Sequence, residues 1–381
     1  MNRTKIIVAG GFLGAGKTTL LWKSAQKLIE KGLSVALITN DQAAELVDSK
    51  FLSLNKLRVA EVSGSCFCCN FNGFTAAIKK ICSETATDII LAEPVGSCVD
   101  LSATIIQPLK QYLNSELQVA PISVLADPIL LKSILAGKNA GLHPDAAYIC
   151  RKQFEESDII LINKSDLLTG EQLEELKLQT IRAFPFATVL TASAEKETGI
   201  DEWLKHATTG NEAGKRIADI DYDVYASGEA ALGWLNGVVE LHGKENTDWD
   251  IFFRNLMEKF VETLDENSLP TGHVKIIAEN DKQYAIGNIT GNSKTLSPNS
   301  SEDCQLPVKA FNIRGSLGKS NSIRLTVNAR VETTPKELDK TVHYVIVSLC
   351  DEKYDAKITA WQCLQPGRPL PTFRFTGPAK I

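Results

Sequence analysis

A glycine-rich run near the N-terminus is the first part of the sequence whose residue types and spacing could do chemistry. Residues 11–18 read Gly-Phe-Leu-Gly-Ala-Gly-Lys-Thr and fit the pattern G-x-x-x-x-G-K-[ST]. An apolar run precedes the pattern and a helix-like run follows it, as the pattern requires. Glycines let successive backbone N–H groups turn inward around phosphate oxygens, and the N-terminus of the following helix adds positive potential. The run therefore predicts a phosphate-binding loop.

Two side chains of this loop could take part in phosphoryl transfer. Lys17 is expected to lie against the β- and γ-phosphates of a nucleoside triphosphate. The hydroxyl group of Thr18 is expected to bind Mg²⁺, which makes Thr18 both a catalytic candidate and a metal ligand. A chance match in a glycine-rich turn is the alternative, and the flanking strand-like and helix-like runs argue against it.

A second segment has the form of a strand that ends at the phosphates. Residues 88–92 are apolar after the first position and lead into Glu93, with Gly96 three residues later. The carboxylate of Glu93 could hold Mg²⁺ through water, and the N–H group of Gly96 could contact the γ-phosphate. Many buried strands end in glutamate, so this interpretation depends on the phosphate-binding loop upstream. We add Glu93 to the catalytic candidates and Gly96 to the nucleotide-binding ones.

The tetrapeptide Asn-Lys-Ser-Asp at residues 163–166 has a side-chain pattern that suits guanine. The carboxylate of Asp166 could accept hydrogen bonds from guanine N1–H and the exocyclic amine, and adenine lacks both donors in that arrangement. Lys164 would lay its aliphatic stem along the ring, and Asn163 would tie two loops together. The loop after the last strand, at Ser193 and Ala194, would place a backbone N–H group on guanine O6. An ordinary polar loop is the alternative.

Three cysteines within four residues form a different kind of candidate site. Cys66 and Cys68 point to one face if the segment is extended, and Cys69 points away unless the chain turns. Clustered thiolates favour Zn²⁺ or Co²⁺ over Mg²⁺ or Ca²⁺. Buried filler thiols or a redox role are the alternatives. The pattern predicts a metal site.

The three thiolates leave one position of a tetrahedral metal site open. Water is one candidate for that position, and Cys98, just past Gly96, is the other. A buried cysteine with no role is the alternative for Cys98. The chain's histidines are scattered and each is expected to be structural; they are His143, His206, His242, His273 and His343.

The elements that must position these residues are visible in the hydrophobic pattern of the first half. Continuous apolar strands separated by helices predict a parallel sheet covered on both faces, with right-handed crossovers. The predicted strands are residues 5–10, 34–39, 88–92, 119–126, 158–163 and 188–191, and the predicted helices include residues 18–30, 74–82 and 170–183.

The second half has a less regular pattern. We expect a nucleotide-binding domain at residues 1–208, a linker at 209–221 and a smaller α+β domain at 222–381, with a surface loop at 290–303. The order of elements favours a ferredoxin-like arrangement of the second domain. Its predicted strands are residues 234–242, 274–278, 284–289, 308–313, 323–331 and 357–363, and its predicted helices are 250–264 and one that begins near 334–335.

Composition limits the classes of partner. The chain has 381 residues and a formal net charge of −5, which gives no electrostatic reason to expect nucleic acid or an anionic membrane. The sequence lacks a secretory signal and any apolar run long enough to span a bilayer, so we expect a cytoplasmic protein. Nine cysteines, an odd number, favour thiol or metal chemistry over a disulfide framework.

The combination of the phosphate loop, the Cys-Phe-Cys-Cys cluster, Glu-x-x-Gly at 93–96 and Asn-Lys-Ser-Asp resembles the CobW-like GTPases. These belong with the nickel-delivery GTPases of hydrogenase and urease maturation. The resemblance implies a P-loop fold and a second domain similar to the CobW C-terminal domain. It also implies phosphate and Mg²⁺ binding by Gly11, Gly14, Ala15, Gly16, Lys17, Thr18 and Thr19, metal binding by Cys66, Cys68 and Cys69, and guanine binding by Asn163, Lys164 and Asp166.

The resemblance further implies a metallochaperone that couples GTP binding and hydrolysis to the handling of zinc, cobalt or a related metal. Its expected partners are GTP, GDP and a client metalloprotein; it leaves open a homodimer and a role in cobalamin metabolism. Residues 40–45 lack the Glu-Phe-Gly-Glu pattern common in this family, so the residue there that senses the γ-phosphate is undefined, and Glu45 is only a guess for a water-positioning group. A histidine-rich tract is absent, which argues against metal storage.

We expect the γ-phosphate and Mg²⁺ to order residues 40–48 and 93–100, and thereby to reposition the cysteines that lie between them in sequence. Intrinsic turnover is expected to be slow without a partner. One rival hypothesis is a GTP-dependent switch that activates a corrinoid or other metalloenzyme and uses the cysteines only structurally. Another is a small-molecule kinase, against which the Asn-Lys-Ser-Asp tetrapeptide speaks.

Overall fold

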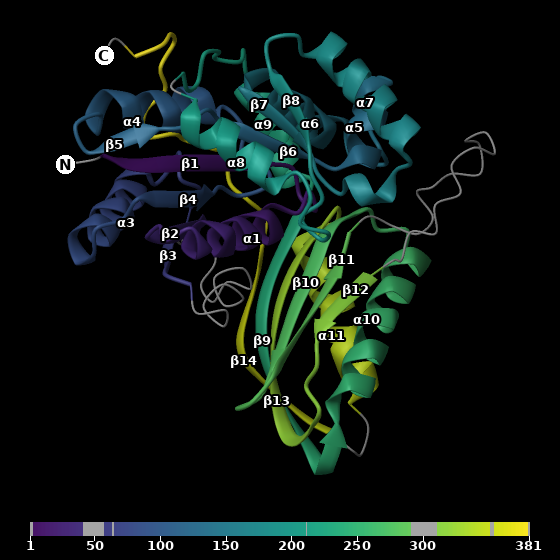
Figure 1. The fold of residues 1–381 in the computed structure, drawn as a ribbon. Coiled ribbons are helices and arrows are strands. Elements are labelled where there is room, and N and C mark those ends of the chain that lie inside the picture. Colours follow the sequence, from purple (N-terminus) through teal and green to yellow (C-terminus); the bar gives the residue numbers. More distant parts are fainter. Residues whose placement is uncertain are drawn as a thin grey trace.

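The computed structural model of the protein describes residues 3–40, 57–62, 65–210, 212–290, 311–350 and 354–379. Within them the chain forms two β-sheets, each with its own helices, one above the other in the view of Figure 1. The described residues contain no helix that is both long and apolar enough to cross a bilayer.

The first sheet is parallel and carries the predicted nucleotide site. Its main strand order is β3-β2-β4-β1-β6-β7-β8, and β5 pairs with the N-terminal half of β1. The strands are β1 (Thr4–Gly11), β2 (Val35–Asn40), β3 (Val59–Val62), β4 (Ile89–Glu93), β5 (Leu117–Val119), β6 (Ser123–Ala126), β7 (Ile159–Ile162) and β8 (Thr188–Thr191). The helices are α1 (Lys17–Glu30), α3 (Phe71–Glu84), α4 (Gln107–Tyr112), α5 (Pro128–Leu135), α6 (Pro144–Glu156), α7 (Gly170–Ala183), α8 (Ile200–Thr209) and α9 (Tyr222–Ala230).

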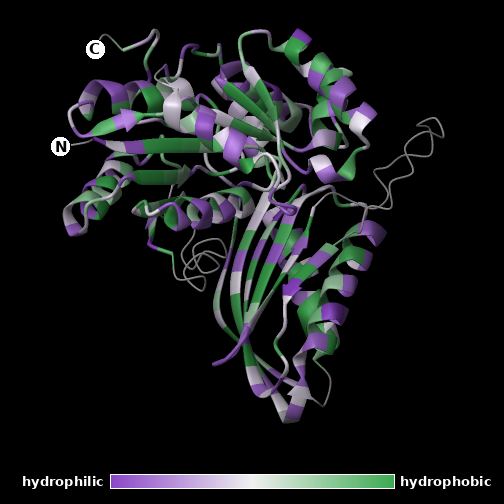
Figure 2. Ribbon diagram, viewed as in Figure 1, coloured by the Kyte–Doolittle hydropathy of each residue, from purple (hydrophilic) through white to green (hydrophobic). Residues whose placement is uncertain are grey.

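Apolar residues on both faces of the central strands explain why this sheet is buried between two helical layers. Ile6 and Ile7 on β1 are fully buried, yet each belongs to a different hydrophobic cluster because successive strand residues point to opposite faces. Helices α1 and α8 contribute to one cluster; α3, α4, α6 and α9 contribute to the other. Figure 2 shows the resulting contrast between hydrophobic strands and helices such as α7, which alternate in polarity.

Two predictions for this sheet needed correction. Residues 119–126 are not one strand, because β5 ends at Val119 and β6 begins at Ser123. Pro121 lies between them, and proline cannot donate the backbone hydrogen bond that a continuous central strand needs. The short strand β3 was missed, since its four residues include Glu61 and do not form an apolar run.

The second sheet is antiparallel and has the strand order β12-β11-β10-β13-β9-β14. Without the hairpin of β11 and β12, the order β10-β13-β9-β14 and the two crossover helices are those of a ferredoxin-like unit. This confirms the predicted fold class, with the hairpin added at one edge. The elements are β9 (Gly233–Asp248), α10 (Trp249–Glu266), β10 (Thr271–Glu279), β11 (Tyr284–Ile289), β12 (Phe311–Gly315), β13 (Lys319–Val331), α11 (Pro335–Leu349) and β14 (Tyr354–Leu364).

The strand expected at 308–313 is described only from Phe311, and the loop expected at 290–303 lies outside the described residues after Thr290. The expected helix start is found: Thr334 caps α11 by accepting a hydrogen bond from the N–H group of Glu337, and Pro335 is the first helical residue.

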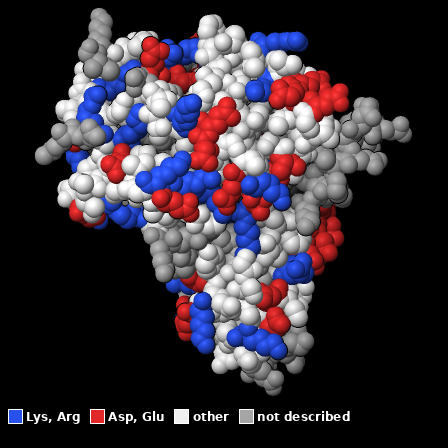
Figure 3. All heavy atoms as spheres, in the orientation of Figure 1, with Lys and Arg blue, Asp and Glu red and all other residues white. Residues whose placement is uncertain are grey.

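The connection between the two sheets stays close to the first domain. Residues 212–221 contain no helix or strand, and the N–H groups of Gly214 and Lys215 donate to the carboxylate of Asp158. The boundary expected at residue 222 stays a prediction. Helix α9, which follows it, packs against α6, and its Tyr225 is buried in the core of the first domain. Figure 3 shows acidic and basic side chains interspersed on the visible face of both domains.

Candidate functional site

The phosphate-binding loop joins the end of β1 to the start of α1, as predicted. Gly11, Gly14 and Gly16 have positive φ angles of 131°, 77° and 90°, which strain any residue with a side chain. A Cβ atom on Gly16 would also lie 2.5 Å from the side-chain nitrogen of Asn163. The ammonium group of Lys17 donates to the carbonyl oxygen of Gly11 at 2.8 Å, so its charge lies across the loop.

The candidate magnesium ligands lie next to each other. The hydroxyl group of Thr18 donates to Oε1 of Glu93 at 3.0 Å, and both residues are buried. Oxygen ligands of this kind suit Mg²⁺. Gly96 lies beside them, because a Cβ atom at that position would be 3.1 Å from Nζ of Lys17. The structure therefore brings Lys17 and Thr18 of the loop together with Glu93 and Gly96, four of the residues that the sequence assigned to phosphate chemistry.

The second domain adds a residue that sequence reasoning missed. Nζ of Lys275, on β10, lies 3.4 Å from the hydroxyl oxygen of Thr18. Part of β10 and the end of β11 also cover the loop, since a Cβ atom on Gly14 would lie 3.1 Å from the side chain of Thr290. Lys275 follows Thr18 by 257 residues. No local pattern in the sequence could have linked the two.

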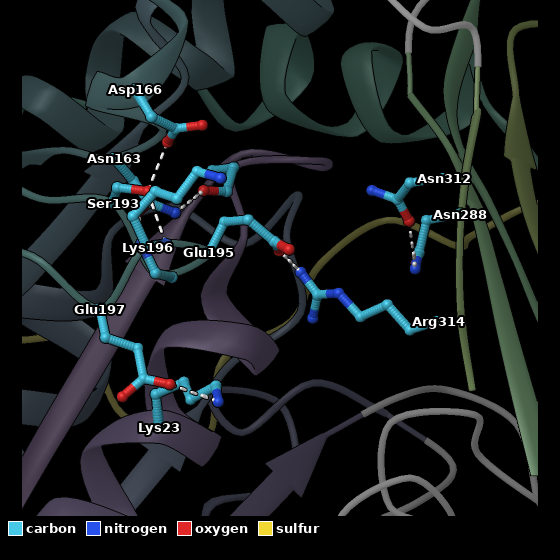
Figure 4. Close-up of polar contacts among 12 residues, drawn as sticks. Lys23, Asn163, Asp166, Ser193, Glu195, Lys196, Glu197, Asn288, Asn312 and Arg314 are labelled. Atoms are coloured by element: carbon cyan, nitrogen blue, oxygen red, sulfur yellow. Dashed lines mark hydrogen bonds and ion pairs between the residues drawn. The ribbon is translucent and has the colours of Figure 1, made fainter.

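The residues predicted to bind guanine also converge (Figure 4). The side chain of Asn163 donates to the carbonyl oxygen of Ala15 at 2.8 Å and accepts from the N–H group of Ala194 at 3.0 Å. It thus ties the phosphate loop to the loop after β8, as expected. The hydroxyl group of Ser193 donates to the carboxylate of Asp166 and so orients it.

Lys164 and the loop after β8 have partners that the sequence did not indicate. The ammonium group of Lys164 lies 2.8 Å from the carboxylate of Asp127, the N-cap of α5. In Figure 4, Glu195 of the loop forms an ion pair with Arg314 on β12 of the second domain. Both domains therefore contact the region where the base is expected to bind.

The three clustered cysteines lie in a turn before α3. The N–H groups of Cys69 and Asn70 both donate to the carbonyl oxygen of Cys66, which brings all three thiols to one side. The Sγ atoms of Cys66 and Cys68 are 2.8 Å apart, and those of Cys68 and Cys69 are 3.8 Å apart. Among the described residues, these three cysteines form a group whose sulfur atoms lie close enough together to hold a metal ion.

Cys98 joins this cluster from the segment after β4. Interaction with the thiol of Cys66 raises its pKa, and Cys66, Cys68 and Cys98 are buried in one hydrophobic cluster, but Cys98 is not among the three cysteines whose sulfurs all lie within 4.8 Å of one another. Hydrogen bonds from Cys68, Cys69 and Cys98 hold the pKa of Cys66 well below its usual range. The hydrogen bond to Cys66 in turn raises the pKa of Cys69 to about 11. Their mutual hydrogen bonding thus lowers the pKa of one thiol of the cluster and raises the pKa of its neighbours.

The donor set fits a thiophilic metal. Sulfurs at about 2.3 Å from a tetrahedral Zn²⁺ lie about 3.8 Å apart, which matches the separation of Cys68 and Cys69. The 2.8 Å between Cys66 and Cys68 is shorter, so that pair would have to open by about 1 Å. Soft sulfur ligands without a carboxylate among them disfavour Mg²⁺ and Ca²⁺.

One short segment links the phosphate loop to the thiols. Gly96 lies beside Lys17, and Cys98, two residues later, contacts the cysteine cluster. The side-chain amide of Gln153, on α6, donates to the carbonyl oxygens of Gly96 at 2.9 Å and Cys98 at 2.7 Å. The hydroxyl group of the intervening Ser97 donates to Glu229, on α9.

A second link runs from the end of β2. The side-chain nitrogen of Asn40 donates to the carbonyl oxygens of Val62 and Ser65, both at 2.8 Å. Its side-chain oxygen accepts from the N–H group of Phe67 at 2.7 Å, inside the cysteine segment. The rest of the expected sensor loop, residues 41–48 with Glu45, lies outside the described residues.

The fold and these loops define a P-loop nucleotide-binding domain. Residues 5–190 match the family model described as the CobW/HypB/UreG nucleotide-binding domain. This part of the chain is a nucleotide-binding domain of that family, which confirms the resemblance found in the sequence.

Named relatives match about half of the chain. The chain is 26% identical over 205 residues to "Zinc-regulated GTPase metalloprotein activator 1" of Dictyostelium discoideum, with 46% of this chain and 43% of the relative covered. It is 28% identical over 186 residues to "Zinc chaperone YeiR" of Escherichia coli, with 46% and 51% covered. It is 25% identical over 227 residues to "Zinc chaperone CobW" of Pseudomonas aeruginosa, with 52% and 58% covered. The chain spans about half the length of the curated relatives it matches.

Among solved structures, Zn(II)-bound YjiA GTPase from E. coli aligns with 92% of this chain and 100% of its own, at 17% identity and a TM-score of 0.37. Similarity at this TM-score supports no further argument.

Proposed function

We propose that the protein is a GTP-hydrolysing metallochaperone that couples its nucleotide state to the binding of a thiophilic divalent metal. The observation that carries this proposal is the segment from Gly96 to Cys98, which contacts Lys17 at one end and the thiol cluster at the other. A change in the position of Gly96 at the phosphates would therefore be transmitted over two residues to Cys98 and the thiol cluster.

The choice of GTP rests on the carboxylate of Asp166, which Ser193 holds in place beside Asn163. In a desolvated site, adenine would leave that carboxylate without its two donors, at a cost of about 1–3 kcal/mol. A competition assay with labelled GTP tests this assignment. If ATP and unlabelled GTP displaced the label equally well, the assignment would be refuted.

Hydrolysis is assigned to the residues that converge on the phosphates. The ammonium group of Lys17 would stabilise charge on the transferring phosphoryl group, and the hydroxyl group of Thr18 and the carboxylate of Glu93 would hold Mg²⁺ directly or through water. Bound Mg²⁺ would neutralise the phosphate oxygens. The segment expected to hold the water-positioning group, residues 41–48, lies outside the described residues, and slow intrinsic turnover stays a prediction.

The metal is cargo, and zinc is the first choice. Three or four thiolates suit Zn²⁺, and two of the relatives above are named zinc chaperones. Cobalt is the alternative that the same ligands allow. A client metalloprotein in the cytoplasm, with cobalamin metabolism as one setting, completes the proposal.

The coupling can be tested by titrating the same protein, loaded with GDP or with a non-hydrolysable GTP analogue, with Zn²⁺ and with Co²⁺. We expect different metal affinities in the two states. Linkage requires metal to change the ratio of GTP to GDP affinity by the same factor. Equal metal affinities in both states would remove the chaperone mechanism.

One observation favours a second function, a GTP-dependent activator of a metalloenzyme in which the cysteines are only structural. Cys66 and Cys68 are 3% and 2% exposed, as structural thiols usually are. The two functions differ in turnover: a chaperone's GTP hydrolysis responds to Zn²⁺, and the activator's does not.

A further inference from the structure

The end of the chain returns to the first domain and passes over the thiol cluster. After β14, residues 365–379 leave the second domain, and the chain end lies beside the first sheet in Figure 1. The N–H group of Phe375 donates to the carbonyl oxygen of Ala103, and that of Ala379 to the side chain of Gln107. We call residues 368–375 the strap.

Main-chain hydrogen bonds join the strap to the cysteine turn. The N–H group of Thr372 donates to the carbonyl oxygen of Cys68 at 2.8 Å, and its hydroxyl group donates to the carbonyl oxygen of Cys69 at 3.1 Å. The N–H group of Leu370 donates to Sγ of Cys69 at 3.2 Å. Two of these three bonds are donated by the main chain of the strap and do not depend on its side chains, and the third needs the hydroxyl group of Thr372.

Two side chains of the strap make the specific contacts. The ring of Phe373 lies between Phe71 and Tyr112, with ring centres 5.5 and 5.1 Å away. Nε of Arg374 lies 2.6 Å from the carboxylate of Asp100, whose side chain is fully buried. A buried carboxylate that loses its cation is costly, so this position needs a positive charge.

The strap also controls access to the sulfurs. Cys66, Cys68 and Cys98 are buried with the strap in place, and Cys69 is the half-buried member of the cluster. The strap contacts the sulfur of Cys69 and the carbonyl oxygens on both sides of the Cys68–Cys69 peptide. A ligand from another protein that approaches through Cys69 meets the strap first.

We propose that the strap is an intramolecular occupant of a peptide-docking groove beside the thiol cluster, and that an extended client segment with an aromatic residue followed by arginine takes its place. The proposal rests on the metallochaperone function above. The aromatic residue fills the slot between Phe71 and Tyr112, and the arginine supplies the cation that Asp100 loses when the strap leaves.

One short stretch of chain connects the strap to the nucleotide site. Asp100 lies two residues after Cys98 and four after Gly96, so Lys17, the thiol cluster and the strap contact the same short segment. The phenol group of Tyr222 also donates to Asp100 at 2.8 Å and helps to fix that end. We therefore expect the nucleotide to change how tightly the strap is held.

The first test measures the alkylation rate of Cys69 in the full-length, metal-free protein, followed by peptide mapping so that each cysteine is read separately. Phe373→Ala combined with Arg374→Ala should release the strap and raise the rate at Cys69 at least 10-fold. The matched control is Arg368→Ala, which removes an exposed strap arginine paired with Asp223 rather than with the groove. It should leave the rate unchanged.

The second test supplies the strap as a separate molecule. A synthetic peptide of residues 366–379 should bind the released variant and restore protection of Cys69, and it should bind the wild-type chain at least 10-fold more weakly. The same peptide with alanine in place of the Phe-Arg pair should do neither. Equal binding of the two peptides, or equal Cys69 rates in the variant and the wild-type chain, would overturn the proposal.

A third measurement separates this proposal from the chaperone function. Transfer of bound Zn²⁺ to a coloured chelator should be at least 10-fold faster in the released variant than in the Arg368→Ala control. Metal affinity could prove independent of the nucleotide while zinc transfer and Cys69 alkylation still respond to the strap. That result would refute the coupling of nucleotide to metal but would support the docking groove. Unchanged transfer and alkylation would remove the groove even where the coupling holds.

Discussion

The phosphate-binding loop and the thiol cluster lie in one domain but are assembled differently. Residues 11–18 form the loop from one stretch of chain, and glycine backbone angles determine its shape. The thiol cluster takes Cys66, Cys68 and Cys69 from one turn, Cys98 from the segment after β4, and a cover from the chain end. A local motif can thus bind phosphate on its own, whereas a metal site built from distant segments can respond to what happens elsewhere.

Removal of the loop's charge should have the largest effect and should test how separable the two sites are. Lys17→Ala deletes the cation beside the β- and γ-phosphates, and we expect GTP hydrolysis to fall at least about 100-fold. Zn²⁺ affinity of the nucleotide-free protein should not change. Phosphate release measures the hydrolysis rate, and a zinc titration measures the Zn²⁺ affinity. A large loss of Zn²⁺ affinity in the nucleotide-free variant would show that the two sites are not separable.

The next effect concerns the long-range part of the thiol cluster. If Cys98 is the fourth ligand, Cys98→Ser should lower Zn²⁺ affinity by about 10- to 100-fold in a competition titration against a chelator. Cys150→Ser is the matched control, because Cys150 is equally buried but its pKa responds to burial and Asp127 and not to the clustered thiols. Similar affinities of the two variants would show that water, or nothing, takes the fourth position.

A smaller effect is expected where the second domain reaches the loop. Lys275→Met removes an ammonium group 3.4 Å from the Thr18 hydroxyl, and we expect turnover to fall about 10-fold because one charged hydrogen bond is lost. Lys275→Arg should recover part of the rate. The control is Lys282→Met, an exposed lysine in the turn after β10. The measurement is the steady-state GTP turnover rate of all three variants at saturating GTP. If Lys282→Met lowered the rate as much as Lys275→Met does, the effect would be due to domain stability.

The same contrast explains how much the sequence could predict. The phosphate loop, Glu93 and the guanine tetrapeptide were found because each follows an apolar strand directly, and parallel strands bring their carboxyl ends to one edge. Lys275, Asp127 and the strap have no such local signal, since their partners lie tens to hundreds of residues away. Alternation of strands and helices also predicted both sheets. It missed β3 and the break at Pro121, because a short run that contains polar residues or proline lacks the continuous apolar pattern of a strand.

The smallest effect concerns a buried acid that braces the segment between the two sites. Glu156, on α6, accepts a hydrogen bond from the N–H group of Ser102, and burial raises its pKa to about 8. Because its folded pKa exceeds the unfolded value, the folded state holds the proton between about pH 5 and pH 8, and stability falls as pH rises through that window.

Glu156→Gln keeps the shape without the titration, so its unfolding free energy should depend less on pH and should exceed the wild-type value near pH 8. Urea unfolding at pH 5.5 and pH 8 measures the difference. An equal pH dependence in the two proteins would mean that Glu156 is ionised in the folded state. The backbone at Ser102 would then be held by a charge rather than by a neutral acid.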